Sequence, residues 1–386
     1  MYKTIPALLC VGCVGVALFL WRGVSSTEGP VSDASNTITV TDLAGRQVTL
    51  RQPIERIVLL RSFFIYDLLP ILGDDVENKL VGWDSSSPKG DRDAYLTLLD
   101  RFPRLSEVTV LGDSLRDAVS PEAVLALKPD LVIIHTFMQR RQLKTVEQLE
   151  RAGLPLLFLS SDDPFRDPQR SLLLLGEVLG KEEEAREATQ FIDGELDEVL
   201  GRLAEMEGPE PSIYLEAAGC PEEYGSTYGF DVRRRGGSWG DIMAGVRCRN
   251  IAANALGTMG RINPEYLLKA DPDVIVLAGA NWTDIPGSLH LGYYADAAEA
   301  RDCLRTFTAR PGWEELEAVK NNRLHGIHMR FCGHVTAFVA AQQLAKWLYP
   351  EEFKDINPEQ SLREFHERFM PIDFGGTWMI GLEENE

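Results

Sequence analysis

Basic residues are scarce in this 386-residue sequence, where 39 Lys and Arg stand against 59 Asp and Glu, for a formal net charge of −20. Such a surface repels phosphate backbones at long range, which excludes a general nucleic-acid-binding role. Long hydrophobic runs are equally scarce, because only one stretch, near the N-terminus, is apolar enough to meet a bilayer. This excludes a polytopic membrane protein. Apolar residues make up 44% of the chain and occur throughout it, which excludes disorder as the dominant state.

Cysteines are few and widely spaced after the N-terminal segment. Cys220, Cys248, Cys303 and Cys332 lack the close pairs that zinc and iron–sulfur sites need. One or two disulfides and buried free thiols are equally supported interpretations, and the pairing stays open. The sequence also contains no Gly-x-Ser-x-Gly elbow, no His-Glu-x-x-His and no Walker loop. These absences count against a chelatase-like enzyme, so we predict a protein without catalytic residues.

The N-terminus has the pattern of an export signal. Lys3 precedes an uncharged run over residues 5–21, and Arg22 is followed by small and polar residues. This pattern predicts a secretory signal that is cut near Ser26, with an uncleaved membrane anchor as the alternative. Cys10 and Cys13 lie inside the apolar run, which makes lipid attachment the less favoured outcome. We therefore expect an exported, periplasmic protein.

Two segments of the sequence are copies of one α/β unit. SPEAVLALKPDLVIIH begins at Ser120 and NPEYLLKADPDVIVLA begins at Asn263. In each copy the first residue is suited to cap a short helix that has Pro at its first position, and a Pro-Asp pair ends the helix. The unbroken apolar run that follows is typical of a strand buried on both faces of a parallel sheet. Two copies predict two lobes of related topology. The identical pairs are Pro121/Pro264, Glu122/Glu265, Leu125/Leu268, Pro129/Pro272 and Asp130/Asp273.

A single long helix is predicted between the two copies. From Glu182 to Met206 apolar residues recur in steps of three and four, and 208–211 is a Gly-Pro-Glu-Pro stop. About 25 helical residues reach roughly 37 Å, enough to bridge two lobes. The fold class is therefore α/β, with two Rossmann-like lobes joined by one long rigid helix and a ligand cleft between the lobes. The predicted divisions are an N-terminal signal or anchor over 1–26, a linker over 27–37, an N-terminal lobe over 38–181, a connecting helix over 182–207 and a C-terminal lobe with a helical tail over 208–386. A hairpin is expected at 38–50, and further strands at 57–60, 80–82, 156–159, 213–215 and 324–327.

Several segments, taken in order, resemble one protein family. They are the hairpin ITVTDLAGRQVTL followed by PIERIVLL, then SPEAVLALKPDLVII, LGKEEEA before the long helix, and RPGWEELEAVKNNRLHGI. Together they resemble the extracellular solute-binding proteins of ABC importers for iron–siderophores, haem and cobalamin, the class with a single helical hinge. The resemblance runs from about Ile38 to Tyr349. It implies two α/β lobes, a shallow cleft, and delivery of a chelated metal to an inner-membrane permease.

Candidate ligand-binding residues follow the C-terminal ends of the predicted strands, where aromatic and arginine side chains are dense. Planar or catecholate ligands need flat aromatic surfaces, and anionic chelates need guanidinium groups. For one aromatic alone, packing in a lobe core is the better interpretation, whereas the whole set favours a binding cleft. For Arg235, which ends a run of three arginines, a ligand contact and a solvated loop are equally supported. The predicted residues are Arg61, Tyr66, Trp83, His135, Tyr224, Tyr228, Arg235, Trp239, Trp282, Arg330 and His334.

No direct metal site is predicted. If the chelator leaves a position on the metal open, we expect His135 or His334 to complete the coordination. For each of the two, an ordinary hydrogen-bonded histidine is the favoured alternative. The favoured cargo is an iron(III) siderophore, and haem, cobalamin and a nickel or other metal complex are the alternatives. The expected partners are the metal chelate and a permease, and the expected state is a monomer without an intrinsic cofactor. A membrane-tethered ligand sensor that does not transport is the alternative of another class.

Overall fold

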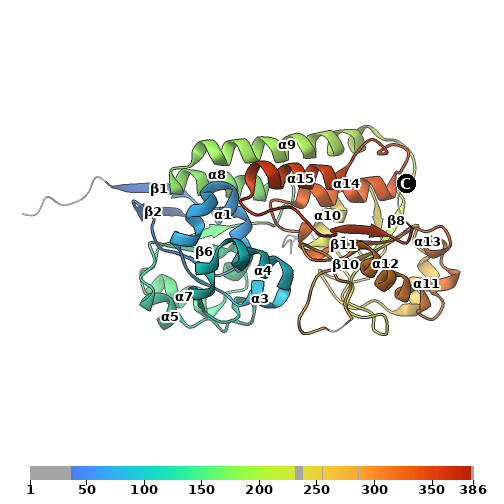
Figure 1. Ribbon diagram of the computed structural model, residues 1–386, viewed down its shortest axis with the longest axis horizontal. Helices are drawn as coiled ribbons and strands as arrows, with labels where there is room; N and C mark the ends of the chain where they lie inside the picture. Colours follow the sequence, from blue (N-terminus) through green and yellow to red (C-terminus); the bar gives the residue numbers. More distant parts are fainter. Residues whose placement is uncertain (1–35, 231–237, 254, 286, 384–386) are drawn as a thin grey trace, which may run out of the picture. The chain divides into compact units, whose positions relative to one another are not determined.

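The computed structural model describes residues 36–230, 238–253, 255–285 and 287–383. The described residues from Thr37 onward belong to one compact unit. Within this unit two five-stranded sheets, one parallel and one with a single antiparallel strand, form two lobes, as Figure 1 shows. The α/β class with two lobes and one connecting helix, predicted from the repeat and the helical periodicity, is confirmed.

The N-terminal lobe begins with the predicted hairpin and continues as an all-parallel sheet. Strands β1 (Thr37–Thr41) and β2 (Gln47–Arg51) pair antiparallel, with Ile38 opposite Leu50. The sheet has the order β5-β4-β3-β6-β7. Its strands are β3 (Ile57–Leu59), β4 (Leu80–Trp83), β5 (Thr109–Val110), β6 (Leu131–His135) and β7 (Leu156–Leu159). Its helices are α1 (Ile65–Leu72), α2 (Val76–Lys79), α3 (Ser86–Gly90), α4 (Arg92–Arg101), α5 (Pro121–Ala126), α6 (Thr136–Arg140), α7 (Lys144–Arg151) and α8 (Asp167–Leu179).

The C-terminal lobe repeats this plan with one strand reversed. Its sheet has the order β12-β11-β10-β8-β9, and only β12 runs antiparallel to its neighbour. The strands are β8 (Ser212–Ala217), β9 (Arg249–Asn250), β10 (Val274–Gly279), β11 (Leu324–His328) and β12 (Met379–Gly381). The helices are α10 (Trp239–Gly245), α11 (Pro264–Ala270), α12 (Ala297–Thr306), α13 (Glu317–Lys320), α14 (Ala337–Leu348) and α15 (Pro358–Phe369). The C-terminal tail, expected to be helical, therefore contains both a helix and a strand, because after α15 the chain returns to the sheet as the edge strand β12.

The internal repeat folds as predicted. Ser120 caps α5 by accepting a hydrogen bond from the backbone N–H of Ala123 at 3.2 Å, and Asn263 caps α11 by accepting one from Glu265 at 2.8 Å. The strand that follows each helix, β6 or β10, is buried at every position. Each is a central strand of its sheet, which explains its unbroken apolar sequence.

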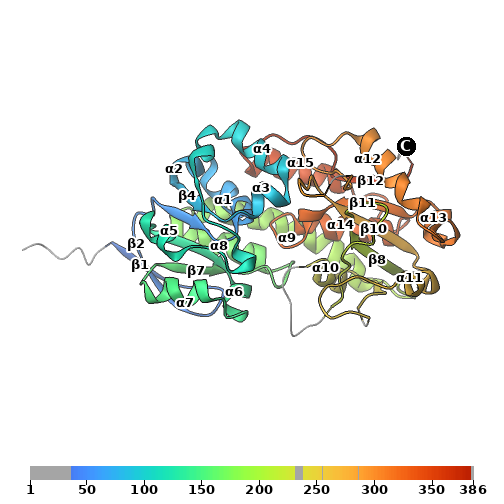
Figure 2. The same cartoon turned by 90° about the horizontal axis from the view of Figure 1, so that it is seen from below.

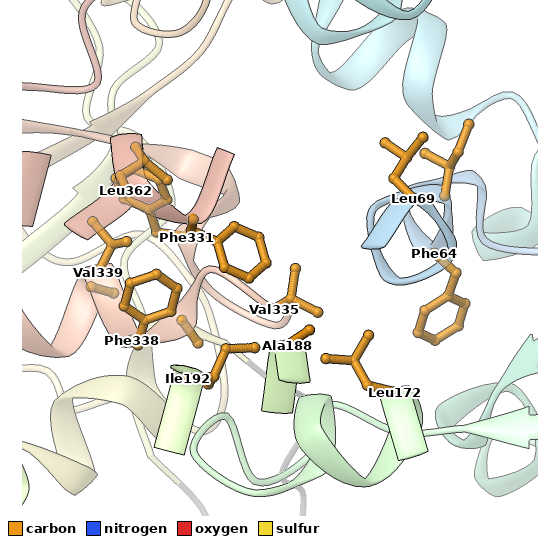
Figure 3. Packing of buried hydrophobic residues seen from close by; sticks show 14 of the residues in the cluster. Phe64, Leu69, Leu172, Ala188, Ile192, Phe331, Val335, Phe338, Val339 and Leu362 are labelled. Atoms are coloured by element: carbon orange, nitrogen blue, oxygen red, sulfur yellow. The ribbon is translucent and has the colours of Figure 1, made fainter. Parts of the chain in front are cut away.

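The connecting helix α9 (Glu182–Glu205) packs against both lobes. It contacts α1 and α8 of the N-terminal lobe and α14 and α15 of the C-terminal lobe, as the views in Figures 1 and 2 agree. Its apolar face carries Ala188 and Ile192, which Figure 3 shows between Leu172 of α8 and Phe338 of α14. One hydrophobic core therefore runs through both lobes along this helix.

Two further features bear on the sequence analysis. Cys220, Cys248, Cys303 and Cys332 are all free, so the structure favours the thiol interpretation over disulfides for these four. Within the described residues, no helix combines the length and hydrophobicity that a membrane span requires.

Candidate functional site

A cavity of about 640 Å³ opens where strand ends of the C-terminal lobe face α3 of the N-terminal lobe. The loops after β8, β10 and β11 supply most of its wall, because the carboxyl ends of parallel strands share one edge of the sheet. The lining residues are Lys89, Ala217, Gly219, Cys220, Glu223, Tyr224, Gly225, Ser226, Tyr228, Met259, Arg261, Trp282, Asp284, Ile285, Met329 and Arg330. We refer to this space as the ligand cavity.

Three aromatic residues from the predicted set line the ligand cavity. Tyr224 accepts a hydrogen bond at its Oη from Nε1 of Trp313 at 2.9 Å, which orients its ring. Tyr228 places its Oη 3.8 Å from Sδ of Met329, and burial raises the pKa of this phenol above its ordinary value. Trp282 follows β10 on a turn closed by its backbone N–H to the carbonyl of Ala280. These rings supply the flat surface that the sequence analysis expects.

A buried ion pair supports the loop that carries Tyr224. Arg310 and Glu216 are 4% and 0% exposed, and Nη2 of Arg310 lies 2.8 Å from Oε1 of Glu216. Nε of Arg310 also donates to the carbonyl of Pro221 at 2.8 Å, and Nη2 donates to that of Glu223 at 2.6 Å. The guanidinium stacks on the Tyr224 ring at 4.5 Å. Sequence analysis missed Arg310, because its partner Glu216 lies 94 residues away and no local pattern around Arg310 indicates this contact.

Two arginines, one from each lobe, lie against the ring of Phe63. The Cζ of Arg330 is 3.4 Å from the ring centroid and that of Arg61 is 5.4 Å away. Burial, together with the nearby charge of Arg61, lowers the pKa of Arg330 to about 10, so Arg330 remains cationic at neutral pH. Burial also lowers the pKa of Arg61, against which the negative charge of Asp84 acts. Of these two, only Arg330 lines the ligand cavity.

A second, smaller cavity of about 40 Å³ shares Arg330 with the first. Tyr66, Arg330 and His334 of the predicted set line it, together with Asp91 and His328. Tyr66 Oη, Arg330 Nε and His334 Nδ1 are buried without a hydrogen-bond partner among the described residues. Burial lowers the pKa of His334 to about 3, so its ring is neutral. The volume suits a few water-sized groups and is far too small for a chelate.

His135 is engaged on both ring nitrogens. Its Nδ1 accepts the backbone N–H of Phe137 at 3.0 Å, so Nε2 carries the proton and donates to Oγ of Ser161 at 2.8 Å. Burial lowers the pKa of this histidine well below its ordinary value. In this arrangement neither nitrogen is available to a metal, which corrects the suggestion that His135 completes a coordination sphere. Within the described ranges, no group of three or more His, Cys, Asp or Glu side chains is placed to hold a metal ion.

Two predicted tryptophans lie in the core. Trp83 and Trp239 have no exposed surface. Trp83 packs at 5.8 Å from the Tyr95 ring, and Nε1 of Trp239 points to Sδ of Met329 at 3.4 Å. Neither offers a ring face to a ligand, which corrects the expectation for both. The prediction for Arg235 falls outside the described residues.

The sequence analysis also missed polar residues that border the two cavities. Lys89 lies on α3, and Arg261 pairs with Glu223 at 3.3 Å, at the edge of the ligand cavity. Asp91 caps α4 and lines the smaller cavity. Lys89 and Asp91 come from the N-terminal lobe, so only the meeting of the lobes gives these two residues a place at the site.

Known proteins of one family share this architecture. A family model described as periplasmic binding protein matches residues 71–330. The chain belongs to the periplasmic binding protein family. A solved structure of a TroA-like periplasmic binding protein, FepB, from Veillonella parvula is 30% identical to this binding protein and covers 90% of it and 100% of that chain, with a TM-score of 0.83.

Two further relatives extend the comparison. An uncharacterized ABC transporter substrate-binding lipoprotein, YvrC, of Bacillus subtilis (strain 168) is 26% identical over 270 residues, which is 69% of this chain and 76% of the relative. MolA of Haemophilus influenzae, solved bound to molybdate, shares the fold at 18% identity with a TM-score of 0.66, covering 88% of this chain and 99% of that one. This periplasmic binding protein is the substrate-binding component of an ABC transporter, a component that delivers a small-molecule ligand to a permease.

Proposed function

We propose that this binding protein captures an iron(III) siderophore in the ligand cavity and delivers it to an inner-membrane permease. The observation that carries the proposal is the cavity itself, with about 640 Å³ of space and a wall that includes Tyr224, Tyr228 and Trp282. Pockets of several hundred Å³ suit ligands of a few dozen heavy atoms, whereas a bare ion fills a small fraction of that space. A chelate fits because it brings its own metal ligands and offers planar groups to the rings.

The charges at the cavity favour an anionic ligand. Lys89 and Arg330 are cationic, and Arg330 sits between the Phe63 ring and the cavity. Arg261 is already paired with Glu223, so its charge is largely balanced. Asp284 also lines the cavity and disfavours ligands with negative charge on every side. Ferric catecholate and carboxylate complexes carry net negative charge on a large, partly planar body, which matches this distribution.

A fluorescence titration tests the proposal. Among the tryptophans that the structure describes, only Trp282 lines the ligand cavity, so a bound iron chelate should quench it. The protein from Thr27 onward is titrated with ferric catecholate, hydroxamate and carboxylate siderophores, haem, cobalamin, molybdate, and free Fe, Ni and Zn salts. Saturable quenching by one ferric siderophore, absent with the bare metals, is the expected result.

Two variants make the test specific. Trp282→Phe should remove most of the quenching while calorimetry still detects binding, because Phe keeps an aromatic surface. Trp347→Phe is the matched control, since Trp347 stacks on His325 away from the ligand cavity and should leave the quenching unchanged. Saturable binding of a bare ion, of molybdate, or of haem or cobalamin in place of a siderophore would contradict the proposal, as would silence across the panel.

We further infer that the protein is exported and works at the outer face of the inner membrane. The pattern of residues 1–26 supports export. The Bacillus subtilis relative is named a lipoprotein, so lipid attachment at Cys10 or Cys13 competes with cleavage near Ser26. Mass spectrometry of the mature N-terminus separates the two, because cleavage predicts a free α-amino group near Thr27 and lipidation predicts an acylated N-terminal cysteine.

A further inference from the structure

The junction between α3 and α4 of the N-terminal lobe is inserted into the C-terminal lobe. Figure 2 shows α3 and α4 on the side of their lobe that faces the other one. At this junction Asp91 and Asp93 are 2% and 1% exposed, although they are charged residues at the start of a helix. A carboxylate is buried to this degree only when it is paired and hydrogen-bonded. Its partners therefore identify what holds the junction in place.

Every side-chain hydrogen bond that Asp93 accepts within the described residues comes from the other lobe. Its Oδ1 accepts from Nδ2 of Asn281 at 2.7 Å, and its Oδ2 accepts from Nε2 of His290 at 2.5 Å and from the backbone N–H of Tyr294 at 3.2 Å. The backbone N–H of Arg92 also donates to the carbonyl of Asn281 at 3.1 Å. Three donors on the connection between β10 and α12 of one lobe thus converge on one carboxylate of the other.

Asp91 adds a second connection beside the first. Its Oδ1 accepts the backbone N–H of Ala94 and caps α4, while its Oδ2 lies 3.1 Å from Nε2 of His328. His328 is 2% exposed and ends β11, directly before Met329 and Arg330 of the ligand cavity. On the other side of the junction, Lys89 is part of the same cavity wall.

We propose that Asp93 is a positioning residue of the ligand cavity: with Asn281, His290 and Tyr294 it forms an interlobe clasp that fixes the spacing between Lys89 and Arg330. The clasp acts through the position of α3 and α4 and does not itself touch the ligand. The clasp consists only of contacts within the protein, so it does not depend on which ligand the cavity binds. Its test is therefore independent of the proposed siderophore.

The clasp depends on pH in a defined direction. The hydrogen bond that His290 donates to Asp93 raises the pKa of His290 above its ordinary value, against the effect of burial. The charges of Asp93, Asp91 and Glu299 act in the same direction. The contribution of His290 is therefore complete below its ordinary pKa of about 6.5 and is lost as pH rises through the raised value.

The carboxylate sets the limit on the acid side. Burial alone would raise the pKa of Asp93, but the hydrogen bonds from His290, Asn281 and Tyr294 outweigh it and hold this pKa below its ordinary value. Its contribution is present above about pH 4 and is lost as pH falls through the lowered pKa. The clasp is accordingly strongest between about pH 4 and pH 6.5.

The experiment uses the unliganded protein and two readouts. Hydrogen exchange followed by mass spectrometry reports the opening of segments 86–101 and 281–294, and NMR titration reports the pKa of His290. Asp93→Asn keeps the shape of the side chain and removes its charge. It should speed exchange in both segments roughly ten-fold or more, since a hydrogen bond to a charged group is lost. It should also return the pKa of His290 towards its ordinary value.

Controls separate a clasp from a purely structural contact. Asp197→Asn, at an exposed site on α9, should change neither readout. In the wild type, segments 86–101 and 281–294 should lose protection against hydrogen exchange as pH rises through the raised pKa of His290. His290→Gln should abolish this pH dependence. Exchange in α9 should stay unchanged in every variant. An ordinary pKa for His290 in the wild type would overturn the proposal. Unchanged exchange of both segments in Asp93→Asn would overturn it as well.

Discussion

Replacement of Arg310 by Met tests how the C-terminal lobe holds the aromatic wall of the ligand cavity. Met preserves much of the side-chain volume and the contact with the Tyr224 ring, but it removes the charge that faces Glu216. Glu216 is completely buried, and Nη2 of Arg310 is its only cationic partner within 4 Å among the described residues. Its other contacts are hydrogen bonds from the hydroxyl of Tyr214 at 2.5 Å and the backbone N–H of Gly225 at 3.1 Å.

The expected cost is large because a buried charge loses its partner. Breaking a buried ion pair from one side destabilises a protein by about 3–5 kcal/mol. The carbonyls of Pro221 and Glu223 lose their donor at the same time, although the loop can turn them to water. We therefore expect the free energy of unfolding to fall by about 3–5 kcal/mol in Arg310→Met.

The assay is urea unfolding, combined with hydrogen exchange of residues 218–228. The double variant Arg310→Met, Glu216→Gln should recover part of the loss, because no unpaired charge remains buried. Arg202→Met is the control: its pair with Asp355 at 2.9 Å is solvent-exposed and should be worth less than about 1 kcal/mol. A loss below about 1 kcal/mol in Arg310→Met, or exchange of 218–228 like that of the wild type, would refute the reasoning.

Three other predictions concern single sites. Gly225→Ala should displace the cavity loop, because a Cβ there would lie 1.8 Å from the carbonyl oxygen of Ala217, and a crystal structure with an unmoved loop would contradict this. Burial raises the thiol pKa of Cys248 and of Cys332 to about 12, so iodoacetamide at pH 8 should modify both slowly until urea unfolds the protein; rapid labelling of the native protein would show that the thiols are open. Asn263→Ala removes a helix cap and should cost about 1 kcal/mol in urea unfolding, and no change would mean that water replaces the cap.

Local patterns were sufficient to predict the repeated α/β unit and the connecting helix of this fold. In each unit the capping residue, Ser120 or Asn263, is followed by a proline and then by an apolar run. These features act through contacts within a few residues, and both units fold as predicted. The periodicity of Glu182–Glu205 likewise reports one buried face of a helix. The same logic brought Tyr224, Tyr228, Trp282 and Arg330 to one cavity, since they follow strands of one sheet. That they contact a ligand stays a prediction.

Side-chain direction is not encoded in these patterns. Trp83 and Trp239 also stand at strand or helix ends, yet both are fully buried in the core, Trp83 against Tyr95 and Trp239 against Met329. His135 has the right position for a metal ligand, but Ser161 and the backbone of Phe137 occupy its nitrogens. In each case the deciding neighbour is set by packing rather than by the residue's own position in the sequence.

The sequence by itself determined the two lobes, the single helix that joins them and the sheet edge where a ligand cavity can form, because periodicity, caps and apolar runs act over a few neighbouring residues. Only the tertiary structure decided which side chains meet across that edge. Asp93 and His290 lie 197 residues apart, and Arg310 and Glu216 lie 94 apart. Their pairing follows from burial: water leaves Asp93 when the lobes meet and leaves Glu216 when the C-terminal lobe folds. Each carboxylate must then accept hydrogen bonds from whatever segment the fold brings beside it.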